Sequence, residues 1–179
     1  MKKSFVLILC LFMLLPSYGQ CEDVAITEDF EKLPKQIIEH FQKHSISNFN
    51  FIDSDGNTFS MGSMEGKIIA INYWSFSCKP CIDEIPKLNL IVEKYKSKVH
   101  FLSILPPGKF NIQSESLQKK IEALSFDYQH VAMTECFSDV FKVPMIFPTH
   151  IIIGRDGRFL DLFFGTDLDR LEKQIVNNI

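Results

Sequence analysis

The sequence predicts an α/β domain with a mixed central sheet flanked by helices. Two near-continuous apolar runs rich in β-branched residues, GKIIAINYW at 66–74 and VHFLSIL at 99–105, are typical of strands buried on both faces. A helical pattern separates them, which favours a parallel crossover connection. Near the end of the chain, THIIIG and FLDLFFG flank the turn sequence RDGR, and this pattern predicts an antiparallel hairpin in the same sheet.

Two elements are expected ahead of this sheet. Apolar residues recur at helical spacing through residues 28–44, which predicts a helix that covers an edge of the domain and is kinked early by Pro34. The stretch FNFIDSDGNTFSM at 49–61 predicts an N-terminal β-hairpin. Its turn falls at Asp55 and Gly56, because glycine tolerates the positive φ that such turns need.

The crossover helix is expected from residue 78 or 80 to residue 97, with a bend at Pro86. The later elements are a helix at 114–124, a short strand at 128–133, a short helix at 136–143 and a capped amphipathic helix at 166–179. The chain shows no repeat and no low-complexity linker. We therefore divide it into a leader at 1–19, an N-terminal helical extension at 20–48 and one α/β domain at 49–179.

The leader has the pattern of a secretory signal peptide. Two lysines precede the apolar run FVLILCLFMLL at 5–15, and cleavage before Gln20 would leave small residues at the −3 and −1 positions. The expected location is therefore outside the cytoplasm, in the periplasm. Lipid attachment at Cys21 is an alternative that would add a membrane association. An uncleaved anchor is a third, although the run is short for a membrane span.

Charge and cysteine content narrow the classes of function. Loss of Lys2 and Lys3 with the leader changes the formal net charge from −3 to −5, and this acidity argues against a nucleic-acid partner. The body of the chain then keeps Cys78, Cys81 and Cys136, too few cysteines for a disulfide scaffold. Cys136 is interpreted as a small buried side chain, with an additional partner-trapping thiol as the alternative.

Cys78 and Cys81 form a CxxC pair where a strand gives way to a helix. Unpaired N–H groups and the positive end of the helix dipole stabilise a thiolate at Cys78, and Lys79 adds a nearby cation. Cys81 follows one helical turn later, within reach of a disulfide. A structural zinc site would need further ligands at a suitable spacing, and none is found. The pair is therefore interpreted as redox-active.

From Phe49 to Ile179 the chain resembles the thioredoxin superfamily and, within it, exported thiol–disulfide oxidoreductases of the TlpA/ResA type. The matching stretches are DGNTFSMGSMEGKIIAINYWSFSCKPCIDEIP at 55–86 and FPTHIIIGRDGRF at 147–159. The resemblance implies a thioredoxin-like fold and disulfide exchange with protein substrates. It implies no cofactor and no metal.

The resemblance also implies roles for four residues. Cys78 is expected to be the exposed attacking thiolate, and Cys81 the thiol that resolves the mixed disulfide. Pro148 is expected to follow a cis peptide bond and to pack beside the pair. Glu84 matches an active-site glutamate that accepts and returns a proton as the thiols change state.

Two residues depart from the family pattern. Asn72 stands where cytosolic thioredoxins carry a buried aspartate, which makes Glu84 the better candidate for proton transfer. Ser77 replaces the aromatic residue that usually precedes the pair, and this should uncover or reshape the surface over Cys78.

We expect a reductant or isomerase, since Pro80 before the second cysteine is more usual in reducing members. The resemblance further implies a membrane electron donor and, as a candidate substrate class, the apocytochrome cysteines reduced in cytochrome c maturation. Two alternatives remain open at this point. One is a copper-binding metallochaperone that uses the cysteines and His150. The other is a non-catalytic thioredoxin-like adaptor whose groove binds a partner.

Overall fold

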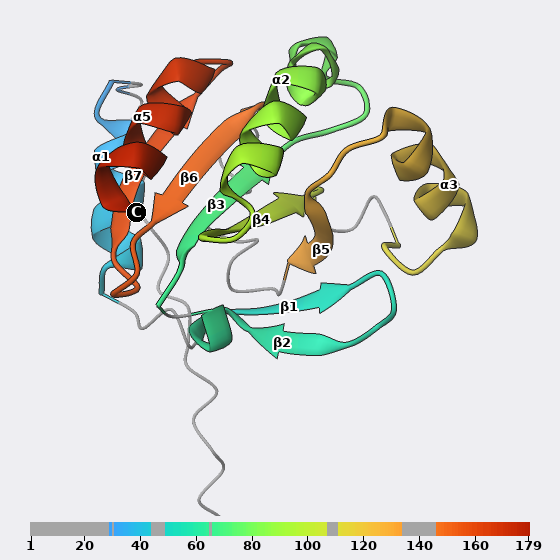
Figure 1. Ribbon diagram of the computed structural model, residues 1–179, viewed down its shortest axis with the longest axis horizontal. Coiled ribbons are helices and arrows are strands. Elements are labelled where there is room, and N and C mark those ends of the chain that lie inside the picture. Colours follow the sequence, from blue (N-terminus) through green and yellow to red (C-terminus); the bar gives the residue numbers. More distant parts are fainter. Residues whose placement is uncertain (1–28, 30, 44–48, 65, 107–110, 134–145) are drawn as a thin grey trace, which may run out of the picture.

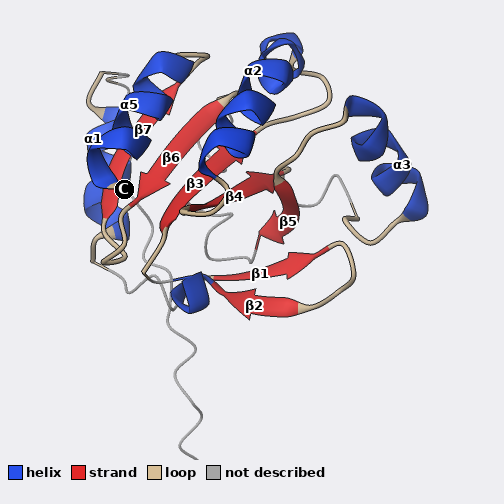
Figure 2. Ribbon diagram, in the orientation of Figure 1, coloured by secondary structure: helices blue, strands red, loops and turns tan. Residues whose placement is uncertain are grey.

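A computed structural model describes residues 29, 31–43, 49–64, 66–106, 111–133 and 146–179. Figures 1 and 2 show the arrangement of its helices and strands. In chain order the elements are α1 (Leu33–Phe41), β1 (Asn50–Asp53), β2 (Thr58–Ser60), the 3-10 turn η2 (Met61–Met64), β3 (Ile68–Tyr73), α2 (Lys79–Tyr95), β4 (Val99–Ile104), α3 (Glu115–Leu124), β5 (Gln129–Met133), β6 (Thr149–Ile153), β7 (Phe159–Phe164) and α5 (Leu168–Asn178).

The described strands form one mixed sheet of order β2-β1-β5-β4-β3-β6-β7. β3 pairs with β4 in parallel, and β4 pairs with β5 in parallel, so the expected crossover through α2 is confirmed. The hairpins β1–β2 and β6–β7 are antiparallel, as is the pairing of β3 with β6. Every residue of β3 is buried, as the apolar run predicted.

The sheet separates two apolar layers. On one face, Ile68 and Ala70 of β3 pack in a cluster with buried residues of α2, α3 and α5. On the other face, Ile69 and Ile71 pack in a second cluster with α1 and the 3-10 turn. This division follows from the strand geometry, because successive side chains point to opposite faces. Figure 1 shows α2 and α5 in front of the sheet and α1 behind it.

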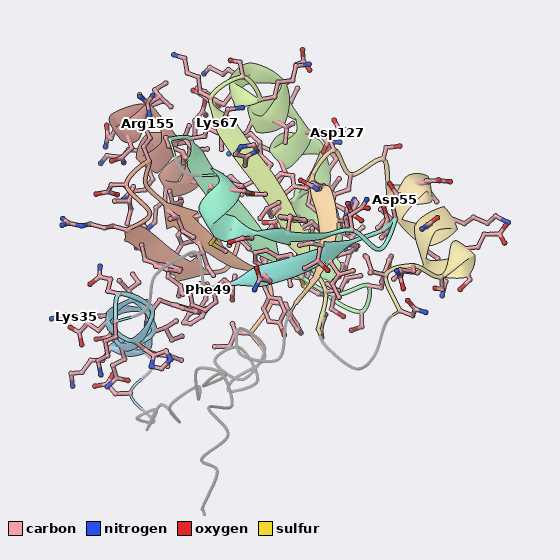
Figure 3. The ribbon with its side chains drawn as sticks, turned by 90° about the horizontal axis from the view of Figure 1, so that it is seen from below. Lys35, Phe49, Asp55, Lys67, Asp127 and Arg155 are labelled. Carbon is pink, nitrogen blue, oxygen red and sulfur yellow. A yellow bond between two sulfur atoms is a disulfide. The ribbon has the colours of Figure 1, made fainter. Side chains whose placement is uncertain are left out.

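The N-terminal helix is shorter than expected, and its proline lies at its start. α1 begins at Leu33, so Pro34 lies in its first turn, where a missing N–H costs no helical hydrogen bond. The helix covers the edge strand β7, as the sequence predicted. Phe41 stacks on Phe159 with ring centroids 4.5 Å apart. Figure 3 shows Lys35 on the opposite side of α1, directed away from the sheet.

Both predicted hairpin turns are confirmed. Gly56 has φ 86°, and the Asp53 carboxylate accepts hydrogen bonds from the backbone N–H groups of Asp55 and Asn57. Gly157 has φ 76° in the second hairpin, where the Gly154 N–H donates to a backbone carbonyl across the turn. Glycine is required at these two positions because left-handed backbone is unfavourable for residues with a Cβ.

The helices α3 and α5 each begin directly after a residue whose side chain caps the first turn. The side chain of Ser114 accepts from Leu117 N–H at the start of α3, and that of Asp167 accepts from Arg170 N–H at the start of α5. α2 contains Pro86 within its span, and the bend expected there stays a prediction. The leader, Cys21, the helix expected at 136–143 and Cys136 lie outside the described residues. Within the described ranges, no helix is both long and apolar enough to cross a membrane.

Candidate active site

The cysteine pair lies at the amino end of α2. Cys78 is the N-cap residue, with extended backbone, and its sulfur accepts a hydrogen bond from the Cys81 N–H at 3.2 Å. The two sulfurs are joined in a disulfide, which confirms that one helical turn brings them within bonding reach. The first backbone N–H groups of a helix have no helical acceptor. Here one of them serves the sulfur of Cys78.

The two cysteines differ in exposure in the expected sense. Cys81 is buried, with 1% of its surface exposed, whereas Cys78 is half-buried at the margin of the first core cluster. A partner sulfur therefore reaches Cys78 more easily. Lys79, expected to act as a nearby cation, forms an exposed ion pair with Asp83 instead. The stabilisation expected for a Cys78 thiolate therefore rests on the N–H groups and the dipole at the start of α2, and it stays a prediction.

The loop before the pair is short and polar. Ser75 accepts a backbone hydrogen bond from the Cys78 N–H at 3.0 Å, and its hydroxyl lies 3.1 Å from that of Ser77. Ser77 is exposed; the expectation that it uncovers or reshapes the surface over Cys78 stays a prediction. The ring of Phe76, one residue earlier, packs against Trp74 with centroids 4.8 Å apart.

Pro148 directly precedes β6 and follows a cis peptide bond from Phe147, as expected. The loop is held at both ends: Thr149 Oγ1 donates to the Ile146 carbonyl at 2.8 Å, and Gly165 N–H donates to the Pro148 carbonyl at 2.9 Å. Phe147 is half-buried and, like Cys78, packs against the first core cluster. That Pro148 itself contacts the sulfurs stays a prediction.

A buried polar cluster lies under the helix that carries the cysteines. Glu84 receives two hydrogen-bonding contacts: Asn72 Nδ2 donates to Oε1 at 2.9 Å, and His150 Nε2 lies 3.4 Å from Oε2. Asn72 Nδ2 also lies 3.4 Å from His150 Nδ1. The side chains of Glu84 and His150 are only 2% and 1% exposed. Glu84 is therefore not a solvated surface carboxylate.

The register of the central strands explains this cluster. Asn72 of β3 and His150 of β6 are directly paired across the antiparallel ladder, so their side chains project to the same face. That face is the one covered by α2, because Ala70 and Ile152, each two residues away, also belong to the first core cluster. Glu84 contacts Asn72 and His150 from α2, where it lies one turn after Cys81.

A second polar chain starts at the same loop. Trp74 Nε1–H donates to Ser103 Oγ at 2.6 Å, and Ser103 Oγ lies 2.8 Å from His130 Nδ1. His130 Nε2 lies 3.0 Å from the Phe126 carbonyl, which can only accept, so Nε2 carries the hydrogen and Nδ1 accepts from the Ser103 hydroxyl. Burial lowers the pKa of His130, because it penalises the charged imidazolium. Sequence reasoning did not predict this chain.

The sequence assigned His150 to a copper site or to an ordinary structural hydrogen bond. In the fold it contacts Glu84 and Asn72. Among the described residues, no group of three or more histidine, cysteine, aspartate or glutamate side chains is arranged to hold a metal ion. Strand alternation in THIII was the signal that could have placed His150 on the helix-covered face, since it lies two residues from Ile152.

Known proteins with related sequences carry out thiol chemistry. The chain is 37% identical over 118 residues to thiol-disulfide oxidoreductase ResA of Bacillus thuringiensis (strain Al Hakam) and 27% identical over 118 residues to ResA of Bacillus cereus (strain ZK / E33L). Each match covers 66% of this chain and 66% of the relative. The chain thus spans about two thirds of the length of these relatives.

A solved structure shares the fold of this chain. The structure of the thioredoxin domain of a thiol-disulfide oxidoreductase from Bacteroides vulgatus superposes with a TM-score of 0.58 at 23% identity, covering 73% of this chain and 96% of that one. This likeness confirms the thioredoxin-like fold expected from the sequence. Residues 43–159 match the AhpC/TSA family, and the chain therefore belongs to that family.

Proposed function

We propose that this chain is an exported thiol–disulfide oxidoreductase that exchanges disulfides with protein substrates through Cys78 and Cys81. One observation carries the proposal. A half-exposed cysteine caps a helix and is disulfide-bonded to a buried cysteine one turn later. An accessible sulfur and a protected partner are what a two-step exchange requires. The names of the related proteins from Bacillus support the same activity.

In the reducing direction, the Cys78 thiolate attacks one sulfur of a substrate disulfide. An S–S bond forms between Cys78 and the substrate, the substrate's own S–S bond breaks, and one substrate thiolate leaves. Cys81 then gives up its proton, for which Glu84 is the proposed acceptor, and attacks the sulfur of Cys78. This step expels the second substrate thiolate and leaves the Cys78–Cys81 disulfide, so two electrons have passed to the substrate.

The direction and the partners are part of the proposal. Pro80 before the second cysteine favours a reductant or isomerase, and such an enzyme needs a two-electron donor to regenerate its dithiol. A membrane electron donor would meet this need for a periplasmic protein. The leader pattern supports export, and the resemblance to ResA-type proteins makes apocytochrome cysteines, as in cytochrome c maturation, a candidate substrate class. Pro148 is proposed to border the groove in which a substrate strand lies.

The proposal is tested by variants of the two cysteines. Purified protein lacking the leader is reduced, and its ability to reduce the disulfides of insulin is measured. Cys78→Ser should abolish the reaction, because it removes the attacking sulfur. Cys81→Ser should accumulate a mixed disulfide between Cys78 and the substrate, detectable on a non-reducing gel. Cys136→Ser is the matched control and should keep the activity of the unmodified protein.

Other outcomes would favour the alternatives. An adaptor would bind its partner equally well with Cys78→Ser and would reduce no disulfide at all. A copper-binding protein would retain Cu(I) through gel filtration and lose it in the Cys78→Ser and His150→Leu variants. Either result, together with unmodified protein that does not reduce insulin, would refute the proposed activity. Measurement of the reduction potential of the Cys78–Cys81 couple then decides the direction, since 30 mV corresponds to about a tenfold change in equilibrium.

A further inference from the structure

The buried cluster of Glu84, Asn72 and His150 has one consistent hydrogen-bonding arrangement. The side-chain amide nitrogen of Asn72 only donates, and its two hydrogens face two acceptors: Glu84 Oε1 at 2.9 Å and His150 Nδ1 at 3.4 Å. His150 Nδ1 is thus the acceptor nitrogen of a neutral ring, and Nε2 carries the hydrogen. That hydrogen points to Glu84 Oε2, 3.4 Å away.

This arrangement satisfies both carboxylate oxygens of Glu84. Each oxygen faces a donor, one from the amide and one from the imidazole. An isolated carboxylate with 2% of its side chain exposed would otherwise be costly. A carboxylate has about four lone-pair sites. With two of them occupied, sites remain at which Glu84 could receive the proton of Cys81, which lies three residues earlier on the same helix.

The imidazole is held in place by its surroundings. His150 stacks on Phe163 of β7, with ring centroids 5.0 Å apart and an interplanar angle of 22°. The Arg170 guanidinium lies over the same Phe163 ring, 4.8 Å from its centroid. Arg170 is fixed in turn by two hydrogen bonds to Asp161, of 2.8 and 2.6 Å. The His150 ring is therefore held in position by Phe163 of the neighbouring strand and, through Phe163, by Arg170 of α5.

Among the described residues, the titratable and charged groups around the cluster come from three places. Tyr128, which directly precedes β5, is a buried titratable group on this face, and the charge of Glu84 adds to burial in raising its pKa, so Tyr128 stays neutral. From α2 itself come Cys78 and Cys81, which carry no charge as a disulfide. Arg170 of α5 is neutralised by Asp161.

We propose that His150 is a positioning residue which, together with Asn72, holds the Glu84 carboxyl group in the orientation that accepts the proton of Cys81. The proposal rests on the proposed thiol–disulfide exchange and assigns a role to a residue that the sequence resemblance left without one. In the step concerned, the S–H bond of Cys81 breaks, an O–H bond forms on Glu84, and the electron pair stays on the Cys81 sulfur. The proton then passes to solvent, and His150 keeps its hydrogen throughout.

The first test is the pH profile of insulin reduction. Loss of a donor to the carboxylate favours its protonated form, so His150→Leu should move the pH midpoint of the reaction upward by about one unit. His150→Gln retains an N–H donor and should restore most of the original midpoint. His130→Gln is the matched control, since His130 is also a hydrogen-bonded histidine packed near Trp74 but has no hydrogen bond to Glu84. It should leave the midpoint within a few tenths of a unit.

A double variant separates positioning from mere structural support. If His150 acts through Glu84, adding His150→Leu to a Glu84→Gln protein should change neither rate nor pH profile further. An additional loss of rate in the double variant would overturn the proposal. An unchanged pH midpoint in His150→Leu alone would also overturn it. The proposed thiol–disulfide exchange would survive either result, provided that the unmodified protein reduces insulin and the Cys78→Ser protein does not.

The tautomer provides a test that does not depend on folding of any buried-site variant. The unmodified protein, labelled with ¹⁵N-histidine, should show an imidazole at pH 7 whose Nε2 carries the hydrogen and whose Nδ1 does not. The imidazole signal of His150 is assigned because it is missing from the spectrum of the His150→Gln protein. If that protein does not fold, the signal is assigned by through-space contacts to Phe163. A hydrogen on Nδ1, in the neutral or the charged ring, would refute the arrangement from which the proposal is drawn.

Discussion

Replacement of Ser103 by alanine should destabilise the protein by about 2–4 kcal/mol. Trp74 is fully buried and Ser103 is 1% exposed. The substitution leaves the indole N–H without its acceptor at 2.6 Å, and an unsatisfied buried donor costs about 1–3 kcal/mol. His130 Nδ1 loses its donor as well, and because His130 is only half-buried this second loss falls near the lower end of that range.

The loss is large relative to the total, because small domains are stable by only about 5–15 kcal/mol. With a urea m-value of about 2 kcal/mol/M, in the middle of the range for small proteins, the unfolding midpoint should fall by about 1–2 M. The chain has a single tryptophan, so its fluorescence reports directly on the affected site. Unfolding is followed in urea by this fluorescence and in parallel by far-UV circular dichroism, to check that both signals change together.

Ser97→Ala is the matched control, since it removes the hydroxyl of an exposed serine just after α2. It should lie within about 0.5 kcal/mol of the unmodified protein. The reasoning fails if Ser103→Ala is as stable as Ser97→Ala, because the chain from Trp74 to His130 would then contribute nothing to stability.

Two further predictions concern His130 and α1. The pKa of His130 is lowered in the folded state, so the unfolded chain binds more protons than the folded protein below about pH 6.5. The free energy of unfolding should therefore fall as the pH drops below this value, by up to about 1.4 kcal/mol per pH unit. His130→Gln should flatten this part of the curve in urea titrations between pH 5 and 7, and an unchanged slope would assign the effect to other groups. Phe41→Ala should cost about 3–5 kcal/mol, since this ring is fully buried and stacked on Phe159. Exposed Lys35→Ala on the same helix is its control, and equal thermal stability of the two variants would mean that α1 is dispensable to the fold.

Local signals in the sequence were sufficient for most of the architecture. The run at 66–74 is apolar because β3 is buried on both faces, and the turns at Gly56 and Gly157 need left-handed backbone. The helix at 28–44 was predicted too long because apolar spacing alone does not mark where a helix begins. Pro34 was the better marker: it fits a first turn without loss of a hydrogen bond.

The site was predicted less completely, for a physical reason. The cysteine pair, Pro148 and Glu84 are marked by short motifs, whereas the contact of Glu84 with His150 depends on a strand register between residues far apart in the chain. Asn72 and His150 are 78 residues apart, and a slip of one residue would turn His150 to the opposite face of the sheet. Alternation indicates the face on which a residue lies. It does not reveal which residue stands opposite.

The docking of α1 on β7 has a consequence for the order in which the chain folds. Gln42, just after α1, donates to the Phe159 carbonyl across a sequence separation of 117 residues. The helix is synthesised first, yet the strand that buries its apolar face is synthesised almost last. Closing such a long loop adds an entropic cost to folding and raises the contact order, which slows folding. During synthesis, the apolar side of α1 is thus exposed until β7 has formed, and in that interval it is available to chaperones.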